Sequence, residues 1–407
     1  MDFDESDEER AFRAEARGWL EANARRREIG DDPDHFYLSG DESPEADAAH
    51  VASCKAWQRT LFDGGWAGIT WPREWGGRGG KGWQQRIFNE EMSRFDVSAG
   101  VFAVGIGMAG PTIIAHGTPA QQERYLPAML RGDEIWCQLF SEPGAGSDLA
   151  GLRTRAVLDG DEWIVNGQKV WTSGAHHSDF GLMLARTDLD APKHRGISAF
   201  IVDMRAPGIE VRPLRQINGM AHFNEVFFTD ARVPTDHLLG DANAGWGVAQ
   251  TMLANERALI GGGGRVGFKD MLALAQRCGV TADARVRQDL AQCFTRTQIL
   301  KWLGWRARSR ASGGLGPESS VMKLAYSQRV ERDGDLALAL QGAAGMLSGD
   351  DAHQHGYWQQ QFLMQWSSRI GGGTDQVQRN VIGDRVLGLP PDVRVDKGVP
   401  FRDLPHS

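Results

Sequence analysis

The N-terminal third of the chain carries the hydrophobic spacing of amphipathic helices. Four apolar residues near the start fall at i, i+4, i+7 and i+8, namely Phe12, Ala16, Trp19 and Leu20. This spacing places them on one face of a helix. Further on, TPAQQERYLPAML carries a helix-start signal, because Thr118 can cap, Pro119 suits the first helical position and Gln121 completes a capping box. The pattern predicts an all-helical segment.

After about Cys137 the pattern changes to short runs rich in β-branched and aromatic residues. AVLDGDEWIVNGQKVW contains two turn dipeptides, Asp159-Gly160 and Asn166-Gly167, between such runs. The same rhythm continues through GISAFIVDM, GIEVRPL and FNEVFFTDARVP to about Pro234. Short strands at this spacing predict a small β-barrel or sandwich.

From about Trp246 the helical texture returns and lasts to the end of the chain. Residues 285–311 contain one glycine and no proline, and residues 318–341 are similar. The chain therefore reads as a block of helices, a block of strands and a second block of helices. A doubly wound sheet would instead show strands and helices in alternation. We therefore predict a multidomain α+β fold. Its parts are an N-terminal all-α domain (1–136), a middle β domain (137–241) and a C-terminal helical bundle (242–407).

Composition narrows the function classes. The chain has 407 residues with a net charge of −8, which argues against a nucleic-acid partner. Its four cysteines include no CxxC pair, which fits neither a zinc site nor a disulfide framework and suits a reducing cytoplasm. The acidic start, MDFDESDEER, does not resemble a signal peptide. No run of about 18 apolar residues occurs, so we expect a cytoplasmic protein without a membrane partner.

One glycine motif imitates a nucleotide-binding loop. FAVGIGMAG contains Gly105-x-Gly107-x-x-Gly110, formally the dinucleotide fingerprint. That motif needs a strand before it and a helix beginning within it, whereas here Pro111 follows and the flanks read as helical. We expect these glycines to serve packing between helices.

The segment CQLFSEPGAGSDLAGL, Cys137 to Leu152, joins the helical part to the strands. Its glycines and hydroxyls form a loop whose backbone N–H groups can approach a pyrophosphate or a flavin edge. A tight turn between domains is the alternative interpretation. QKVWTSGA follows some two dozen residues later and places Trp171 and Ser173 on a strand.

Together with the closing GGGTDQVQRNVIGDRVLGLP, these segments resemble the acyl-CoA dehydrogenase family of flavoproteins. The resemblance spans essentially the whole chain in the right order, including HGTPAQQERYLPAML and FNEVFFTDARVP. It implies an FAD cofactor bound between the β domain and a C-terminal four-helix bundle. It also implies an acyl-CoA substrate and an electron-transferring flavoprotein as acceptor. Because a neighbouring subunit completes each FAD site in the family, it implies a homodimer or homotetramer, with a heteromer as an alternative.

The resemblance assigns flavin contacts to two stretches around the strands. The first runs from Gln138 to Ser147, with Ser141 at the pyrimidine side and Ser147 serving both cofactor and thioester tail; Gly146 belongs to it. The family often has an aromatic residue where Gln138 stands. The second is Trp171, Thr172 and Ser173, with the indole against the flavin and a hydroxyl near its N5. For Trp171 the alternative is a place in the barrel core.

The remaining cofactor contacts are implied to come from a neighbouring subunit. They are Arg277, Gln341 to Gly345, Thr374 and Gln376. Two of these matches depart from the family pattern. The arginine–aromatic–glycine patch has Val280 in place of its phenylalanine, and the QGAAG turn of Gln341 to Gly345 has fewer glycines than usual.

The implied reaction is an α,β-dehydrogenation, which needs a base for the α-proton and donors for the thioester carbonyl. Many relatives carry the base two residues before the closing threonine, but that position is Gly372 here. Its backbone N–H still suits the carbonyl. Isovaleryl-CoA and long-chain acyl-CoA dehydrogenases instead carry a glutamate directly before an arginine on an earlier helix, and Glu256-Arg257 matches that pair. Glu256 is therefore the predicted base, with a surface glutamate as the alternative; the substrate contacts are predicted as Ser147, Asn255, Arg257 and Gly373.

Two further questions stay open. Gly261 to Gly264 follow Glu256, where they either break the helix or leave room for a broad, branched or ring-bearing acyl group. The degraded Arg277–Val280 patch and the QGAAG turn also keep a non-catalytic or half-site subunit as an alternative function. A flavoprotein oxidase of the acyl-CoA oxidase kind is the other alternative.

Overall fold

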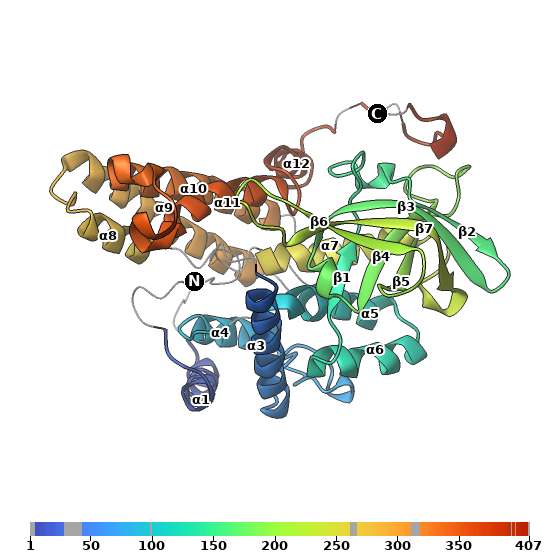
Figure 1. Ribbon diagram of the computed structural model, residues 1–407, viewed down its shortest axis with the longest axis horizontal. Coiled ribbons are helices and arrows are strands. Elements are labelled where there is room, and N and C mark those ends of the chain that lie inside the picture. The colour runs from blue at the N-terminus through green and yellow to red at the C-terminus, as the bar shows by residue number, and fades with distance from the viewer. Residues whose placement is uncertain are drawn as a thin grey trace.

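The computed structural model describes residues 5–27, 43–97, 100–260, 267–310, 318–391, 393–394 and 396–405. The N-terminal helices are α1 (Asp7–Asn23), α3 (Pro44–Asp63), α4 (Gly82–Met92), α5 (Gly110–His116) and α6 (Pro119–Arg131). The C-terminal helices are α7 (Gly245–Ile260), α8 (Phe268–Arg277), α9 (Ala284–Arg310), α10 (Glu318–Gln341), α11 (Tyr357–Ile370) and α12 (Asp375–Val381). Between them lies a sheet, and α7 crosses the middle of the molecule between the sheet, the N-terminal helices and the C-terminal bundle (Figure 1).

The helix signals of the N-terminal third are confirmed. Phe12, Ala16 and Leu20 are buried on one face of α1. Thr118 accepts a hydrogen bond from the backbone N–H of Gln121, the Gln121 side chain closes the capping box, and Pro119 begins α6. These signals lie within a few residues of one another, so no distant contact is needed to produce them.

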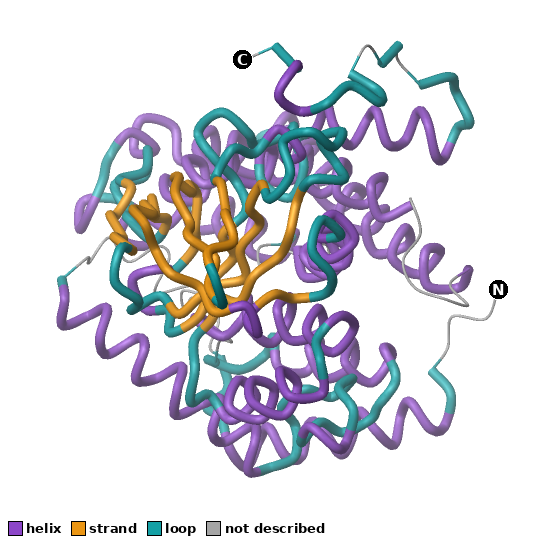
Figure 2. Tube along the Cα trace, turned by 90° about the vertical axis from the view of Figure 1, so that its right-hand side faces the viewer, coloured by secondary structure: helices purple, strands orange, loops and turns teal. Residues whose placement is uncertain are grey.

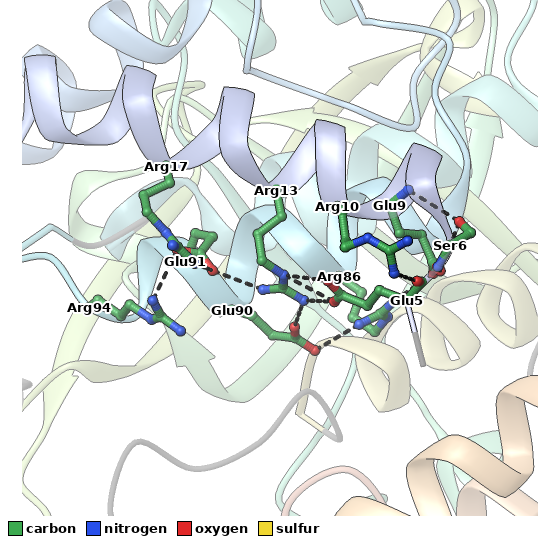
Figure 3. A network of polar contacts seen from close by, with 10 residues as sticks. All are labelled: Glu5, Ser6, Glu9, Arg10, Arg13, Arg17, Arg86, Glu90, Glu91 and Arg94. Atoms are coloured by element: carbon green, nitrogen blue, oxygen red, sulfur yellow. Dashed lines mark hydrogen bonds and ion pairs between the residues drawn. The ribbon is translucent and has the colours of Figure 1, made fainter. Parts of the chain in front are cut away.

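A polar network fastens α1 to α4 (Figure 3). At its centre is Glu91 of α4, whose side chain is fully buried. Arg13 Nη1 lies 2.8 Å from one of its carboxylate oxygens, and Arg17 Nε lies 2.8 Å from the other. Arg94 adds a third cation at 3.3 Å. A buried carboxylate needs such compensation, because burial alone disfavours its charge.

The middle part is one continuous sheet (Figure 2). Its strands are β1 (Trp136–Leu139), β2 (Arg155–Asp159), β3 (Glu162–Ser173), β4 (Phe180–Arg186), β5 (Ile197–Asp203), β6 (Ile209–Leu214), β7 (Phe223–Pro234) and β8 (Leu238–Leu239). They run in the order β6-β7-β3-β2-β4-β5-β8, with β1 paired parallel to β4. Among these strands β6 and β8 are the two ends and do not pair with each other, so the sheet is not a closed barrel.

Both faces of the central strands are buried, one against other strands of the same sheet and the other against helices. Met183 and Ala185 of β4 face a core made by the sheet's own strands, with Phe200 of β5. Their neighbours Leu182 and Leu184 face the opposite way, into the core shared with the N-terminal helices and α7. The alternation follows from the two-residue period of a strand.

One of the two predicted turns is wrong. Asp159-Gly160 does join β2 to β3, with Gly160 at φ +67°. Asn166-Gly167 instead lies inside β3, where the register with β7 shifts between Val165 and Gly167. A Cβ at Gly167 would lie 2.5 Å from Thr154 Oγ1, so this glycine serves a close approach within a bulge.

The glycine motif at 105–110 packs helices, as predicted. No strand leads into it; Gly105–Ala109 is a short π-helical segment that continues into α5. A Cβ at Gly110 would lie 2.1 Å from the ring of Trp71, and one at Gly107 would lie 3.4 Å from Leu259 of α7. The glycines therefore let α5 and its preceding turn approach their neighbours.

Two further findings concern the chain as a whole. The four cysteines, all in the described ranges, are free thiols. Of the helices that the structure describes, none has the length and hydropathy required to cross a membrane. The Gly261 to Gly264 run lies outside the described residues.

Candidate active site

The loop after β1 is tied to β3 by a buried ion pair that the sequence analysis did not identify. Lys169 Nζ lies 2.8 Å from Glu142 Oε1 and donates to the carbonyl oxygen of Phe140 at 3.0 Å. The backbone N–H groups of Arg153 and Thr154 donate to the same carboxylate at 2.6 and 2.9 Å. Burial would raise the pKa of Glu142, but the Lys169 charge and these hydrogen bonds outweigh it and lower that pKa. The base of the loop is thereby fixed.

The outer part of this loop is open. The backbone carbonyl oxygen of Ser141 accepts a hydrogen bond from Val170 N at 2.9 Å, so the loop runs beside the end of β3. Beyond it, Cβ atoms at Gly144 and Gly146 would meet no other atom within 4 Å. Ser147 is exposed. Gly144, Gly146 and Ser147 are therefore accessible to a ligand, whereas Ala145 between them is buried.

Trp171 lies on the surface, so its alternative place in the core is excluded. It is 57% exposed and adopts φ +62°, a left-handed conformation that is rare for a residue with a side chain. The register between β3 and β7 shifts between Lys169 and Thr172. This bulge turns the indole outward, with Phe223 edge-on at 5.9 Å between ring centroids. Such strained, re-aimed residues are typical of ligand sites.

Thr172, next to this indole, has an unmatched polar group. Its Oγ1 is buried and has no hydrogen-bond partner among the described residues. A buried hydroxyl without a protein partner is a group that a bound polar ligand or a water molecule would satisfy. An outward-facing indole, an unmatched hydroxyl and an open glycine loop together fit a planar polar cofactor such as a flavin.

Glu256 lies on α7 and is held by the strand that begins the sheet. Gln138 Nε2 of β1 donates to Glu256 Oε2 at 3.3 Å. Burial raises the pKa of Glu256, while the Gln138 hydrogen bond and the charges of Arg257 and Lys323 act in the opposite direction. Its partial burial and raised pKa distinguish it from a fully exposed glutamate. A carboxylate with raised proton affinity is what a general base for a weak carbon acid requires.

Gly372 and Gly373 form the turn between α11 and α12. They adopt φ +63° and +84°, conformations that favour glycine. Gln378 Nε2 donates to the carbonyl oxygens of Gly372 and Gly373 at 2.9 and 3.3 Å. Thr374 caps α12 by accepting from Val377 N at 3.2 Å. The turn is therefore held from the helix that follows it.

Asp375 anchors this turn to α10, the helix that also reaches Glu256. Its carboxylate accepts from Ser327 Oγ at 2.5 Å and from Arg369 Nε at 3.2 Å, and Lys323 Nζ lies 3.7 Å away. Burial lowers the pKa of Lys323, and the charges of Asp375 and Glu256 raise it. Lys323 is thus a buried cation acting on both the turn and Glu256. Lys323 was not among the predicted site residues, although a lysine within the apolar run VMKLAY is a pattern that could have marked it.

The other predicted site residues fall into two groups. Asn255 and Arg257 flank Glu256 on α7 and are half-buried, whereas Arg277 is exposed at the end of α8. Figure 1 shows α8 at the edge of the bundle away from the sheet. Gln341 is buried at the end of α10, where its Nε2 donates to Ala337 O at 3.0 Å, and Gly345 lies in the short helix Gly342–Met346 that follows. Gln376 is exposed on α12.

Comparison with known proteins gives matches along the whole chain. Models of the acyl-CoA dehydrogenase N-terminal, middle and C-terminal domains match residues 6–133, 137–231 and 243–387. Acyl-CoA dehydrogenase IpdE1 of Mycobacterium tuberculosis is 37% identical over 387 residues, covering 94% of this chain and 98% of its own.

Two solved structures are similar along nearly the full length. One is described as the Tcur3481-Tcur3483 steroid ACAD, with a TM-score of 0.83 and 29% identity over 96% of this chain and 100% of that chain. The other is the ChsE4-ChsE5 complex from Mycobacterium tuberculosis, with a TM-score of 0.77, 29% identity and the same coverage of both chains.

Proposed function

Because this chain belongs to the acyl-CoA dehydrogenase family of flavoproteins, we propose that Glu256 is its catalytic base. The reaction converts an acyl-CoA thioester into the trans-2-enoyl-CoA. The observation that carries this proposal is the environment of Glu256, a carboxylate with a raised pKa held by Gln138. The position two residues before Thr374 offers no competing acid, since it is Gly372.

In this mechanism the chain's own groups handle the proton and the carbonyl. Glu256 accepts the proton from C2 of the thioester, and burial raises the pKa of its carboxyl group in the direction that this step needs. The backbone N–H of Gly372 donates to the thioester oxygen, where negative charge develops. Gln138 and Lys323 favour the ionised form of Glu256, since both oppose the rise in its pKa. Asn255, Arg257, Gly373 and Ser147 contact the substrate.

FAD fits the open face of β3 and would take up the C3 hydrogen as hydride. The residues proposed to hold it from this chain are Gln138, Ser141, Gly146, Ser147, Trp171, Thr172 and Ser173. The unmatched Thr172 hydroxyl and the exposed Trp171 indole support this assignment. Arg277, Gln341, Gly345, Thr374 and Gln376 would complete the site of a second subunit, which makes a homodimer or homotetramer the proposed assembly. The domains proposed are 1–136, 137–241 and 242–407.

The proposed substrate is a bulky, ring-bearing acyl-CoA, and the proposed electron acceptor is an electron-transferring flavoprotein. A similar solved structure is described as a steroid ACAD.

A second candidate is a half-site subunit that needs a different partner chain. Two similar structures carry paired names, Tcur3481-Tcur3483 and ChsE4-ChsE5. The altered Arg277–Val280 patch agrees with an incomplete site. The ionisable Glu256 argues against a subunit without chemistry of its own.

Anaerobic flavin bleaching with a panel of acyl-CoAs tests the proposal. The purified protein should be yellow and should bleach fastest with ring-bearing thioesters. A preference for short straight chains would contradict the substrate assignment. Protein that is colourless until a partner chain is added would select the half-site subunit, and peroxide formed under air without another acceptor would select an oxidase.

A further inference from the structure

Three potential metal ligands meet where the beginning of α3 reaches the corner after β3. Asp47 lies in the first turn of α3, and His176 and His177 lie in the short helix that follows β3. One ligand atom from each residue falls within 4.8 Å of the other two. Zinc with ligands at about 2.0–2.2 Å places them about 3.5 Å apart, so closure by roughly 1 Å would form a site.

Neighbouring groups orient the His176 ring as they would a metal ligand. Its Nδ1 lies 3.1 Å from Asn224 Oδ1. The amide orientation of Asn224 is fixed, because its Nδ2 donates to the carbonyl oxygens of Thr172 at 3.0 Å and His222 at 3.3 Å. Nδ1 of His176 therefore carries the proton and Nε2 carries the free lone pair. A histidine whose other nitrogen donates to an oxygen is the usual arrangement around a bound metal.

The second ring completes a pair of nitrogens beside one carboxylate. His177 Nε2 lies 2.9 Å from Asp47 Oδ1, and the two imidazole centroids are 3.9 Å apart. An ion at this point would replace the proton of the His177–Asp47 bond. Asp47 and His177 are half-buried and His176 is more exposed, which leaves a path for an ion to enter.

The ligand types of this cluster suit a transition metal. Two imidazole nitrogens with one carboxylate match zinc and its neighbours in the transition series, and neutral imidazole is the form that binds them. Zinc sites with three protein ligands take water in the fourth position.

We propose that Asp47, His176 and His177 form a divalent transition-metal site of the zinc class, with water in the fourth position. The ion would link α3 to the short helix that follows β3. Its role is to hold the N-terminal domain against the flavin-binding edge of the sheet. This site is independent of Glu256 and of the reaction proposed above.

Titration calorimetry with ZnCl2 on the full-length, chelator-treated flavoprotein tests the site. The wild type should bind one zinc ion, and zinc should raise its melting temperature. His176→Asn and His177→Gln keep a polar group at Nδ1 and Nε2 respectively, and each should weaken binding about tenfold or more. Asp47→Asn should do the same from the opposite element.

A matched control is His355→Gln, which alters an exposed His–Asp pair in which His355 Nδ1 lies 3.0 Å from Asp350 Oδ1. This variant should bind zinc as the wild type does. X-ray absorption spectroscopy at the zinc edge needs only the wild-type protein. It should report nitrogen and oxygen ligands, including imidazole. The proposal is overturned by the absence of one-to-one binding, by wild-type affinity in the ligand variants, or by a sulfur-dominated ligand set.

Discussion

The side-chain amide of Gln138 lies 3.3 Å from a carboxylate oxygen of Glu256, joining the first strand of the sheet to α7. The two residues are 118 positions apart in the sequence. Two opposing effects act on the pKa of Glu256: burial raises it, and the hydrogen bond from the Gln138 amide lowers it. The direction in which the pKa of Glu256 moves can therefore be predicted for each substitution of a charged or polar neighbour.

Replacing Gln138 with leucine should shift the pH dependence of activity. The substitution removes a group that lowers the pKa of Glu256, so the pKa should rise further. Because the base must be ionised, activity on the acidic side should fall, and the acid limb of kcat/KM should move up by about half to one pH unit, or about 1 kcal/mol. The exposed Gln276→Leu variant is the control, and an unmoved limb in Gln138→Leu would count against the contact.

Lys323→Met should shift the same limb in the same direction. The buried cation lowers the pKa of Glu256, and Asp375 keeps Ser327 and Arg369 as partners after its loss. Purely structural damage would lower kcat at all pH values alike, whereas a charge effect moves the limb upward. Lys301→Met, which removes an exposed lysine on α9, should leave the profile unchanged. A uniform loss without a shift would assign Lys323 to folding alone.

Two tryptophans on β3 should respond in opposite ways to alanine substitution. Trp171 is 57% exposed, so Trp171→Ala should change the free energy of unfolding by less than about 0.5 kcal/mol while the bound flavin per chain falls. Trp163 is 9% exposed in the core of the sheet, so Trp163→Ala should cost about 3–5 kcal/mol. Denaturation curves and the flavin-to-protein absorbance ratio measure both. Full flavin retention in a stable Trp171→Ala protein would remove the indole from the cofactor site.

The Glu91 network predicts a stability that depends on pH (Figure 3). Burial would raise the pKa of Glu91, but hydrogen bonds from Arg17 and Arg13 outweigh it and hold the pKa at about 2. This is below its ordinary value of 4.5, so the stabilisation is present above about pH 4.5 and is lost as the pH falls toward 2.

Glu91→Gln should lower the free energy of unfolding by about 3 kcal/mol near pH 7. The difference from the wild type should shrink at about pH 3, where the wild type has lost much of the contribution. Glu90→Gln removes the half-exposed partner of Arg13 and should cost less than about 1 kcal/mol. Urea unfolding curves at both pH values measure this, and a pH-independent difference would contradict it.

Local signals in the sequence predicted local structure well, and failed where distant partners decide. The Phe12–Leu20 stripe and the Thr118 capping box lie within single helices, and both are confirmed. Asn166-Gly167 has the chemistry of a turn, but pairing with β7 and the approach of Thr154 keep it inside a strand. The sequence of a dipeptide does not show which other strands will pair with it in the folded sheet.

The candidate site shows the same division. Glu256 could be chosen from sequence because Gly372 lacks a carboxylate, and its burial on α7 agrees with that choice. The residues that shift the pKa of Glu256 could not be predicted from the sequence. Gln138 and Lys323 approach it from other elements of the fold, far away along the chain. The Lys169–Glu142 pair was missed for the same reason, being fixed by the path of the loop across β3.

The most direct test of the account is the rate at which the enzyme exchanges the C2 hydrogen of an acyl-CoA for deuterium in D2O. This exchange reports proton removal separately from flavin reduction. Glu256→Gln should fold, keep its flavin and lose exchange by about a hundredfold or more, whereas Glu123→Gln, at an exposed position on α6, should exchange as the wild type does. Exchange by Glu256→Gln near the wild-type rate would show that another group is the base.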